Sequence, residues 1–181
     1  MTAGDLRWYV HRATRMSPGE TASRVRDQVR QRAWRARQVH PGQAATRVVA
    51  TQPRLFPTVL DAAAGAAVTD AARAALLAAA EQVLTGRGEV LGATRHDLHD
   101  PNWFHDPSTG RHAPNDRYAF RIRFRSEAET GNIKQIWEVS RHQHLTVLAA
   151  AWHLSGDPRY ADAVAAQLRS WWRENPFLSG V

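Results

Sequence analysis

The residues best suited to chemistry lie between Gly131 and His153, in the segment GNIKQIWEVSRHQHLTVLAAAWH. Helical spacing places a stripe of residues on one face: Ile133, Trp137, Ser140, His144, Leu148 and Ala151. Polar residues fill six of the seven positions in its middle: Glu138, Ser140, Arg141, His142, Gln143 and His144. An unpaired polar group costs about 1–3 kcal/mol when buried. These groups are therefore expected either to pair with one another or to line a cavity.

Two interpretations of this polar cluster follow from spacing alone. In the first, the side chains form a buried hydrogen-bond network that joins two helices. In the second, they face an open hollow that holds a ligand. Glu138 can reach Arg141 or His142 in either case, because residues three and four positions apart are neighbours on a helix. Trp137 is expected to lie in the core.

Several helices must position this cluster. Ser17-Pro18-Gly19-Glu20 predicts a helix start with a serine cap and a capping box. Thr69 and Gly86 bound another predicted helix. One long helix is predicted from Asn132 to Leu154, and Asp157-Pro158 starts a last helix that ends at Asn175-Pro176.

The last helix is expected to bury one face, formed by Tyr160, Ala161, Val164, Leu168 and Trp171. Short extended segments are expected at residues 47–50 and 89–92, and a polar, aromatic loop at 95–118. Long helices with short connections predict an all-α fold of packed helical hairpins with minor strands.

The chain has 181 residues, of which 43% are hydrophobic and 23% are charged, as in a globular protein. It contains no cysteine, which excludes disulfides and thiolate metal sites. No run of about 18 apolar residues predicts a membrane span. The first residues, MTAGDLRWYVHR, do not resemble a secretory signal, so the sequence leaves the compartment unknown.

The net charge of +7 is concentrated at the N-terminus. Residues 1–40 contain nine arginines against three acidic residues, a net charge of +6, and Lys134 is the one lysine of the chain. Such a basic segment indicates either an anionic partner or a solvated helix face.

Four histidines fall in the loop of residues 95–118 beside three aspartates: His96, His99, His105 and His112 with Asp97, Asp100 and Asp106. Histidine and aspartate are zinc ligands, but the spacing matches no helix-borne motif such as HExxH. No metal site is predicted. The sequence also lacks a phosphate loop, a GxSxG motif and a dinucleotide fingerprint, so no cofactor is expected.

Four segments, taken in order, resemble the heparinase II/III-like polysaccharide lyases. They are IWEVSRHQHL, the opening RWYVHRATRMSPGETASRVRDQVRQR, the turn WFHDPSTGRHAP and the helix SGDPRYADAVAAQLRSWWRENP. Together they cover most of residues 6–177, whereas residues 41–95 contribute little. Each motif is weak by itself, and the ordered set is fairly specific.

The resemblance implies an α/α toroid of helical hairpins followed by a β-sandwich domain. It also implies β-elimination on uronic-acid polysaccharides. In these lyases the group that neutralises the substrate carboxylate follows the Glu-Asn-Pro element, and the catalytic tyrosine comes later. The chain is accordingly expected to be the N-terminal portion of a toroid over residues 1–181, truncated at its C-terminus. No residue is assigned a catalytic role, and the chain alone is expected to be inactive.

Substrate contacts carry over from the resemblance more readily than catalysis does. The predicted substrate-binding residues are Arg141, His142, Gln143, His144 and Trp103. Glu138 is expected to orient Arg141, whose guanidinium can hold a carboxylate or sulfate through two contacts. Trp103 and Phe104 are expected either to stack on a sugar ring or to close the toroid against solvent.

The predicted partner is an anionic polysaccharide, and the sequence does not identify which one. Two other functions remain open. The first is a non-catalytic helical scaffold that binds anionic polysaccharide. The second is a basic nucleic-acid-binding module. Against it stand the lack of a recognition motif and the lack of exposed aromatic residues interleaved with the N-terminal arginines. No nucleic-acid partner is predicted, and the oligomeric state is left open.

Overall fold

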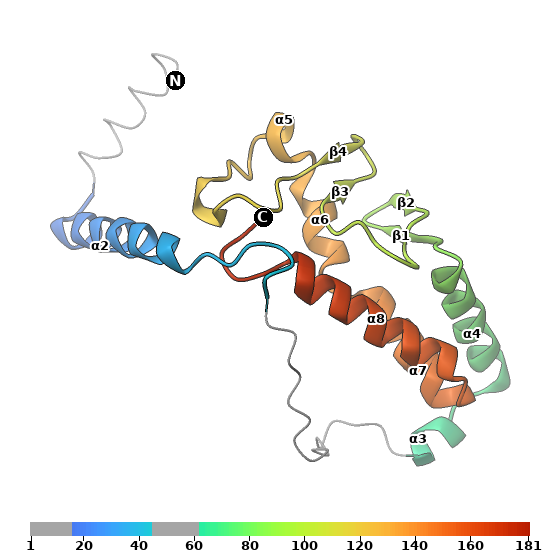
Figure 1. The fold of residues 1–181 in the computed structure, drawn as a ribbon. Coiled ribbons are helices and arrows are strands. Elements are labelled where there is room, and N and C mark those ends of the chain that lie inside the picture. The colour runs from blue at the N-terminus through green and yellow to red at the C-terminus, as the bar shows by residue number, and fades with distance from the viewer. Residues whose placement is uncertain (1–15, 45–61) are drawn as a thin grey trace. The chain divides into compact units, whose positions relative to one another are not determined.

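The computed structural model describes residues 16–44 and 62–181 (Figure 1). The chain divides into two compact units, one ending at Gln38 and the other beginning at Val39. Most described residues are helical, with a few short antiparallel strands, so the predicted all-α class is confirmed. Within the described residues, no helix has the length and apolar character of a membrane span.

The first unit contains helix α2 (Pro18–Trp34) and the 3-10 turn η1 (Arg35–Arg37). The Ser17 side chain accepts a hydrogen bond from the Glu20 amide at 3.2 Å, as the start signal predicts. The predicted helix near residues 6–10 lies outside the described residues.

The aliphatic side chains of α2 are exposed within the described residues of this unit. Val25 and Val29 are 57% and 58% exposed, and α2 has no buried residue. The Glu20 carboxylate accepts from Arg24 at 2.9 Å, one helical turn further on. The described part of the first unit is therefore a solvated basic helix.

The second unit has helices and strands in this order: α3 (Ala62–Ala66), α4 (Asp70–Leu84), β1 (Gly88–Val90), β2 (Ala93–Arg95), β3 (His105–Asp106), β4 (Arg111–His112), η2 (Ala119–Arg121), α5 (Glu127–Thr130), α6 (Ile133–Val139), α7 (Gln143–Ser155) and α8 (Pro158–Glu174). Strands β1 and β2 form one antiparallel hairpin, and β3 and β4 form another. The segment predicted as a strand at residues 47–50 lies outside the described residues.

Helices α7 and α8 form an antiparallel hairpin, and α4 packs mainly against α7 (Figure 1). Local capping residues delimit these helices as predicted. Thr69 caps α4, and Asp157 caps α8 by accepting from the Arg159 amide at 3.0 Å. Gly156 ends α7 in a left-handed conformation, and Asn175 ends α8.

The prediction of one helix from Asn132 to Leu154 is wrong. The structure has two helices, α6 and α7, separated at residues 140–142. The buried face of α8 also differs from the prediction. Tyr160 and Gln167 are buried, whereas Leu168 is 43% exposed.

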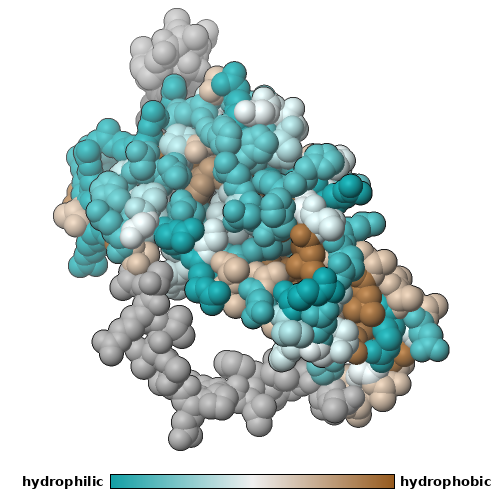
Figure 2. All heavy atoms as spheres, turned by 45° about the vertical axis from the view of Figure 1, so that its right-hand side comes forward, coloured by the Kyte–Doolittle hydropathy of each residue, from teal (hydrophilic) through white to brown (hydrophobic). Residues whose placement is uncertain are grey.

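The core of the second unit lies where α4, α6, α7, α8 and the loop of residues 98–113 meet. Its large buried side chains include Leu98, Trp103, Phe104, Ile136 and Leu148. Hydrophobic side chains also reach the surface between hydrophilic ones, on the face that Figure 2 displays. The loop that was predicted to be polar and aromatic thus contributes its aromatic side chains Trp103 and Phe104 to the core.

The residues after α8 are fastened to distant parts of the same unit. The Val39 amide donates to the Phe177 carbonyl at 3.1 Å, and the Ser179 hydroxyl donates to the Val39 carbonyl at 2.6 Å. The Gly180 amide donates to the Arg117 carbonyl at 2.9 Å. Gly180 has φ +78, and a Cβ there would lie 2.8 Å from the Phe104 ring, so the position requires glycine.

Candidate functional site

The polar cluster of residues 138–144 lies at the α6–α7 turn. His142 has φ +61 and ψ +26, a left-handed conformation that is strained for any residue other than glycine. This residue ends the run of α6 and starts α7 in a new direction. The hypothesis of one continuous helical stripe therefore fails at His142.

Glu138 holds the two most exposed residues of the turn. Its carboxylate accepts from Gln143 Nε2 at 2.8 Å and from Arg141 Nη1 at 3.3 Å. In a continuous helix, residues five apart point about 140° away from each other and cannot touch. The left-handed residue at position 142 is what brings Gln143 back to Glu138. The predicted orientation of Arg141 by Glu138 is present in the structure.

The His142 ring fills the space between two tryptophans. It makes edge-on contacts with Trp103 at 5.6 Å and with Trp171 at 4.9 Å between ring centroids. His142 Nε2 is buried and lacks a hydrogen-bond partner among the described residues, as does Trp171 Nε1. Burial lowers the pKa of His142, so its imidazole is neutral near pH 7.

His144 points into the interior and is paired there. Its Nε2 lies 2.8 Å from Gln167 Oε1, while Gln167 Nε2 donates to the Leu98 carbonyl at 2.9 Å. Because the amide of Gln167 is oriented by that carbonyl, His144 must donate through an Nε2–H. Burial lowers the pKa of His144, and the hydrogen bond with Gln167 only partly offsets that effect.

A cavity of about 620 Å³ opens beside the turn. Its wall combines the polar residues Glu138, Gln143 and His144 with residues of α4 and of the β1 strand, including Arg87 and Glu89. The polar cluster is therefore divided in two. Arg141 and Gln143 are exposed, His144 is buried and bonded, and His142 lies between them.

The aromatic residues of the predicted site are placed differently from expectation. Trp103 is 2% exposed, and its Nε1–H donates to Ser170 Oγ at 3.2 Å, so both its faces are taken up by packing. Phe104 is also buried. Trp137, which was expected in the core, is 46% exposed and lies beside Phe124. The prediction for Trp137 is wrong because α6 buries Ile136 and Val139, and Trp137 follows Ile136 by one residue, about 100° around the helix.

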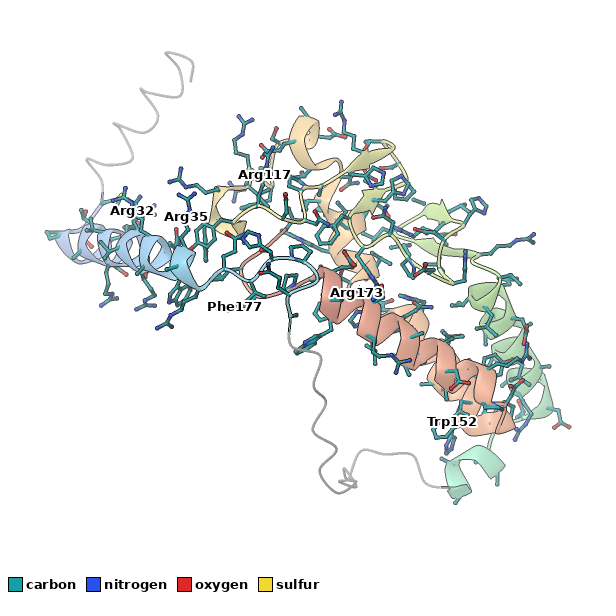
Figure 3. The ribbon with its side chains drawn as sticks, viewed as in Figure 1. Arg32, Arg35, Arg117, Trp152, Arg173 and Phe177 are labelled. Atoms are coloured by element: carbon teal, nitrogen blue, oxygen red, sulfur yellow. The ribbon has the colours of Figure 1, made fainter. Side chains whose placement is uncertain are left out.

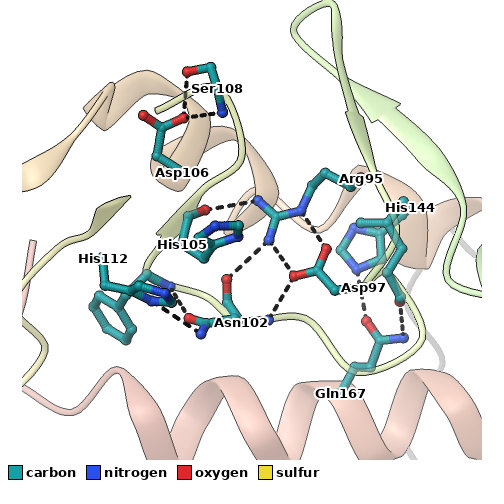
Figure 4. A network of polar contacts seen from close by, with 11 residues as sticks. Arg95, Asp97, Asn102, His105, Asp106, Ser108, His112, His144 and Gln167 are labelled. Atoms are coloured by element: carbon teal, nitrogen blue, oxygen red, sulfur yellow. Dashed lines mark hydrogen bonds and ion pairs between the residues drawn. The ribbon is translucent and has the colours of Figure 1, made fainter. Parts of the chain in front are cut away.

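Sequence reasoning missed the buried arginine of the neighbouring loop. Arg95 is 1% exposed and makes a two-point contact with Asp97, at 2.9 and 2.7 Å (Figure 4). Arg95 also donates to the backbone carbonyls of Asn102 and His105, both at 3.1 Å. Because two of its partners are carbonyls, no side-chain pattern in the sequence announces this network.

Asp106 closes the turn predicted at residues 106–110. Its carboxylate accepts from Ser108, Thr109 and the Asn132 amide. Burial raises the pKa of Asp106, but these hydrogen bonds outweigh it and lower the pKa to about 2. Gly131 has φ +68, and a Cβ there would lie 2.8 Å from the Asp106 carboxylate, so glycine is required.

Two histidines of this loop form a stacked pair. His105 and His112 face each other across the β3–β4 hairpin with ring centroids 4.8 Å apart, and Asn102 contacts His112 (Figure 4). Burial, together with the neighbouring His112 and Arg95, lowers the pKa of His105. In residues 16–44 and 62–181, no group of three or more histidine or acidic residues is arranged to hold a metal ion.

Comparison with known proteins supplies the remaining evidence. A family model described as "Heparinase II/III N-terminus" matches residues 67–180, which is more than half of the chain. No curated protein and no solved structure matches the chain. The matched range includes the α6–α7 turn, the buried Arg95 network and the α7–α8 hairpin. The chain therefore belongs to the heparinase II/III family, whose members are associated with lyase chemistry and polysaccharide degradation.

Proposed function

We propose that the chain is the N-terminal part of a polysaccharide lyase that cleaves uronic-acid-containing polysaccharides by β-elimination. The observation that carries this proposal is the α6–α7 turn within the matched range. There Glu138 accepts hydrogen bonds from an exposed guanidinium and an exposed amide, and Glu138 and Gln143 line a cavity. Arg141 pairs with a carboxylate or sulfate of the substrate, and Gln143 hydrogen-bonds a sugar hydroxyl.

The chemistry explains why cationic and amide groups belong in such a site. The C5 proton of a uronic acid lies next to a carboxylate and becomes acidic only when the charge of that carboxylate is neutralised in the transition state. A base then removes the proton, and an acid protonates the departing oxygen. In our proposal Arg141 and Gln143 contact the sugar without taking part in proton transfer.

His142, His144 and Trp103 support this turn from beneath. Their rings are neighbours, with Trp103 lying 5.6 Å from His142 and 6.2 Å from His144 between centroids. Packing against Trp103 and Trp171 holds His142 in its left-handed conformation, and that conformation places Gln143. In this proposal the three residues affect substrate binding by shaping the turn.

The α7–α8 hairpin with α4 is, in this proposal, one segment of an α/α toroid. Helical hairpins that pack on neighbouring hairpins explain the exposed apolar side chains on the outer surface of this unit, among them Leu168 and Trp172. Residues 1–181 then form a single N-terminal portion of the toroid.

The acid–base pair of the elimination is expected outside the described residues. Both described tyrosines, Tyr118 and Tyr160, are buried. Tyr160 donates to Glu81 at 2.8 Å, and this hydrogen bond raises the pKa of Tyr160, which disfavours the phenolate that a base requires. We therefore expect the 181-residue chain to bind uronate polymers without cleaving them.

A binding panel tests the proposal. The chain is titrated with polyuronate, a sulfated glycosaminoglycan and a neutral polysaccharide, and the affinities of Arg141→Ala and Gln143→Ala are compared with the parent. We expect each substitution to weaken binding of the acidic polymers about tenfold. Arg111→Ala is the control, because Arg111 is also exposed and lies in strand β4 of the β3–β4 hairpin, outside the α6–α7 turn. Equal affinity for neutral and acidic polymers would contradict the proposal.

Activity is tested on the product of the complete gene. We expect it to release unsaturated uronates, detected by their ultraviolet absorbance, from at least one acidic polymer. If no acidic polymer yields this product although binding at the turn holds, the second candidate function applies: a scaffold that binds anionic polysaccharide without cleaving it. The buried tyrosines are the observation that favours this second function.

A further inference from the structure

We propose a second glycan-binding surface on this chain, formed by Phe124, Arg125, Lys134 and Trp137, which we call the aromatic–cationic surface. Its ligand is an anionic polysaccharide strand that carries carboxylates or sulfates. The inference shares its ligand class with the proposed function but rests on different residues from the α6–α7 turn.

Two exposed aromatic rings form the floor of this surface. Trp137 of α6 is 46% exposed and Phe124 of the preceding loop is 44% exposed. Their centroids are 5.9 Å apart and the ring planes are inclined by 38°. Two adjoining aromatic rings that are half open to solvent offer an apolar platform for the face of a sugar ring.

Arg125 places a positive charge on this platform. Its Cζ lies 5.5 Å from the centre of the Phe124 ring. Two nearby arginines, Arg117 and Arg123, share the single carboxylate of Glu129, at 3.1 and 2.8 Å. Within the part of the chain that the structure describes, Arg125 has no carboxylate partner. Its guanidinium is thus oriented by the ring and free to bind an anion.

Lys134 adds a second cation to the aromatic–cationic surface. It precedes Trp137 by three residues in α6, so the two side chains lie on the same side of the helix, one turn apart. Lys134 is exposed and has no ion-pair partner among the residues described. An aromatic platform with two unpaired cations near it fits a strand that combines apolar sugar faces and anionic groups.

Affinity measurements with defined oligosaccharides test the proposal. The probes are an oligouronate, a sulfated oligosaccharide and a neutral oligosaccharide of equal length, with single-stranded RNA as a different class of polyanion. We expect Trp137→Ala to weaken oligouronate binding about tenfold. Trp137→Phe should retain most of the affinity, and Arg125→Ala should lower it about threefold and reduce its salt dependence.

The matched control is Trp152→Ala. Trp152 is 49% exposed, a fraction similar to that of Trp137. It lies near the C-terminal end of α7, at the end of the α7–α8 hairpin away from Arg173 (Figure 3). We expect no change in affinity for this variant. Thermal unfolding of each variant checks the fold, and Arg125→Ala, which removes only an exposed side chain, keeps the test valid if Trp137→Ala unfolds.

Lys134 allows a direct footprint of the surface. Because it is the one lysine in the chain, an amine-reactive acylating reagent labels only Lys134 and the α-amino group. We expect bound oligouronate to abolish labelling of the Lys134 peptide and leave that of the α-amino group unchanged.

Three outcomes overturn the inference. They are unchanged binding by Trp137→Ala, unprotected Lys134 at saturating oligouronate, and tighter binding of the RNA than of either acidic oligosaccharide. The sulfated and carboxylated probes identify which anion is preferred. If Trp137→Ala loses binding while Arg141→Ala and Gln143→Ala do not, the aromatic–cationic surface is supported and substrate binding at the α6–α7 turn is contradicted. If only Arg141→Ala and Gln143→Ala lose binding, the turn is supported and the aromatic–cationic surface is contradicted.

Discussion

The Arg95 network and the α6–α7 turn are two polar clusters in the same unit, and they are satisfied to different degrees. Arg95 is buried and donates to two carboxylate oxygens and two carbonyls. At the turn, Arg141 and Gln143 share one carboxylate and remain exposed, while His142 Nε2 is buried without a partner among the described residues. Saturated polar groups stabilise a fold, whereas unsaturated and exposed ones are available to a ligand.

Replacing Arg95 should have the largest effect. Arg95→Ala removes the guanidinium that donates to Asp97 and to two backbone carbonyls, and we expect the free energy of unfolding to fall by about 3 kcal/mol. Arg95→Lys should restore only part of this, because an ammonium cannot make the two-point contact. Urea unfolding measures the free energy of unfolding of both Arg95 variants, and Arg111→Ala, at an exposed arginine, is the control. A loss below about 1 kcal/mol would mean that the network is dispensable.

Replacing Asp106 should have the next largest effect. The fall of its pKa from 3.8 to about 2 corresponds to about 2 kcal/mol of native-state stabilisation. This contribution is present above the unfolded pKa near 3.8 and is lost as the pH falls toward 2. Asp106→Asn should therefore lower the free energy of unfolding by about 2 kcal/mol at pH 7 and have little effect at pH 2. A constant difference at all pH values would contradict this assignment.

The left-handed conformation of His142 is a distinctive feature of the α6–α7 turn. We expect both His142→Ala and His142→Gly to destabilise the protein, because each removes the ring between Trp103 and Trp171. Glycine accepts a positive φ without penalty, so His142→Gly should be more stable than His142→Ala by about 1 kcal/mol. At an ordinary helix position, an alanine variant is more stable than a glycine variant. The same order at position 142 would show that the left-handed turn is not retained.

Acidification should weaken the buried part of the turn. His142 and His144 have lowered pKa values, so below about pH 6.5 the unfolded state takes up protons that the folded state does not. The free energy of unfolding should fall as the pH drops from 6.5 to the folded pKa values. His144→Gln, which cannot titrate, should reduce this slope in urea unfolding series. An unchanged slope would mean that His144 contributes nothing to it.

The exposed half of the turn should have the smallest effect on stability. Arg141→Ala and Gln143→Ala should change the free energy of unfolding by no more than about 0.5 kcal/mol. Their large effect should instead be on binding of acidic polysaccharide. A stability loss comparable to that of Arg95→Ala would mean that Arg141 and Gln143 stabilise the fold as Arg95 does. The contrast between the two clusters would then be lost.

The parts of the fold that depend on local chemistry were predictable. Ser17, Thr69 and Asp157 cap helices where the sequence indicates, because a side-chain oxygen and the next amides suffice to form a cap. The Glu138–Arg141 pair was predictable for the same reason, since both residues are near in sequence. Family membership was indicated by four ordered motifs and agrees with the match to residues 67–180.

What could not be predicted depends on contacts distant in sequence. The break at His142 is fixed by Trp103 and Trp171, which are remote from it along the chain. This break explains why the continuous helix was a wrong prediction. The roles of Arg95 and Gln167 were also inaccessible, because their partners are backbone carbonyls whose positions only the folded chain defines.

The fastening of the segment after α8 has a consequence for folding kinetics. The hydrogen bond from Ser179 to Val39 joins residues 140 positions apart, and closing so large a loop costs entropy that only a nearly complete core can offset. Such bonds form late and have little weight in the transition state. Slow amide exchange at Val39, Gly42 and Gly180 would therefore report that the whole unit has finished folding.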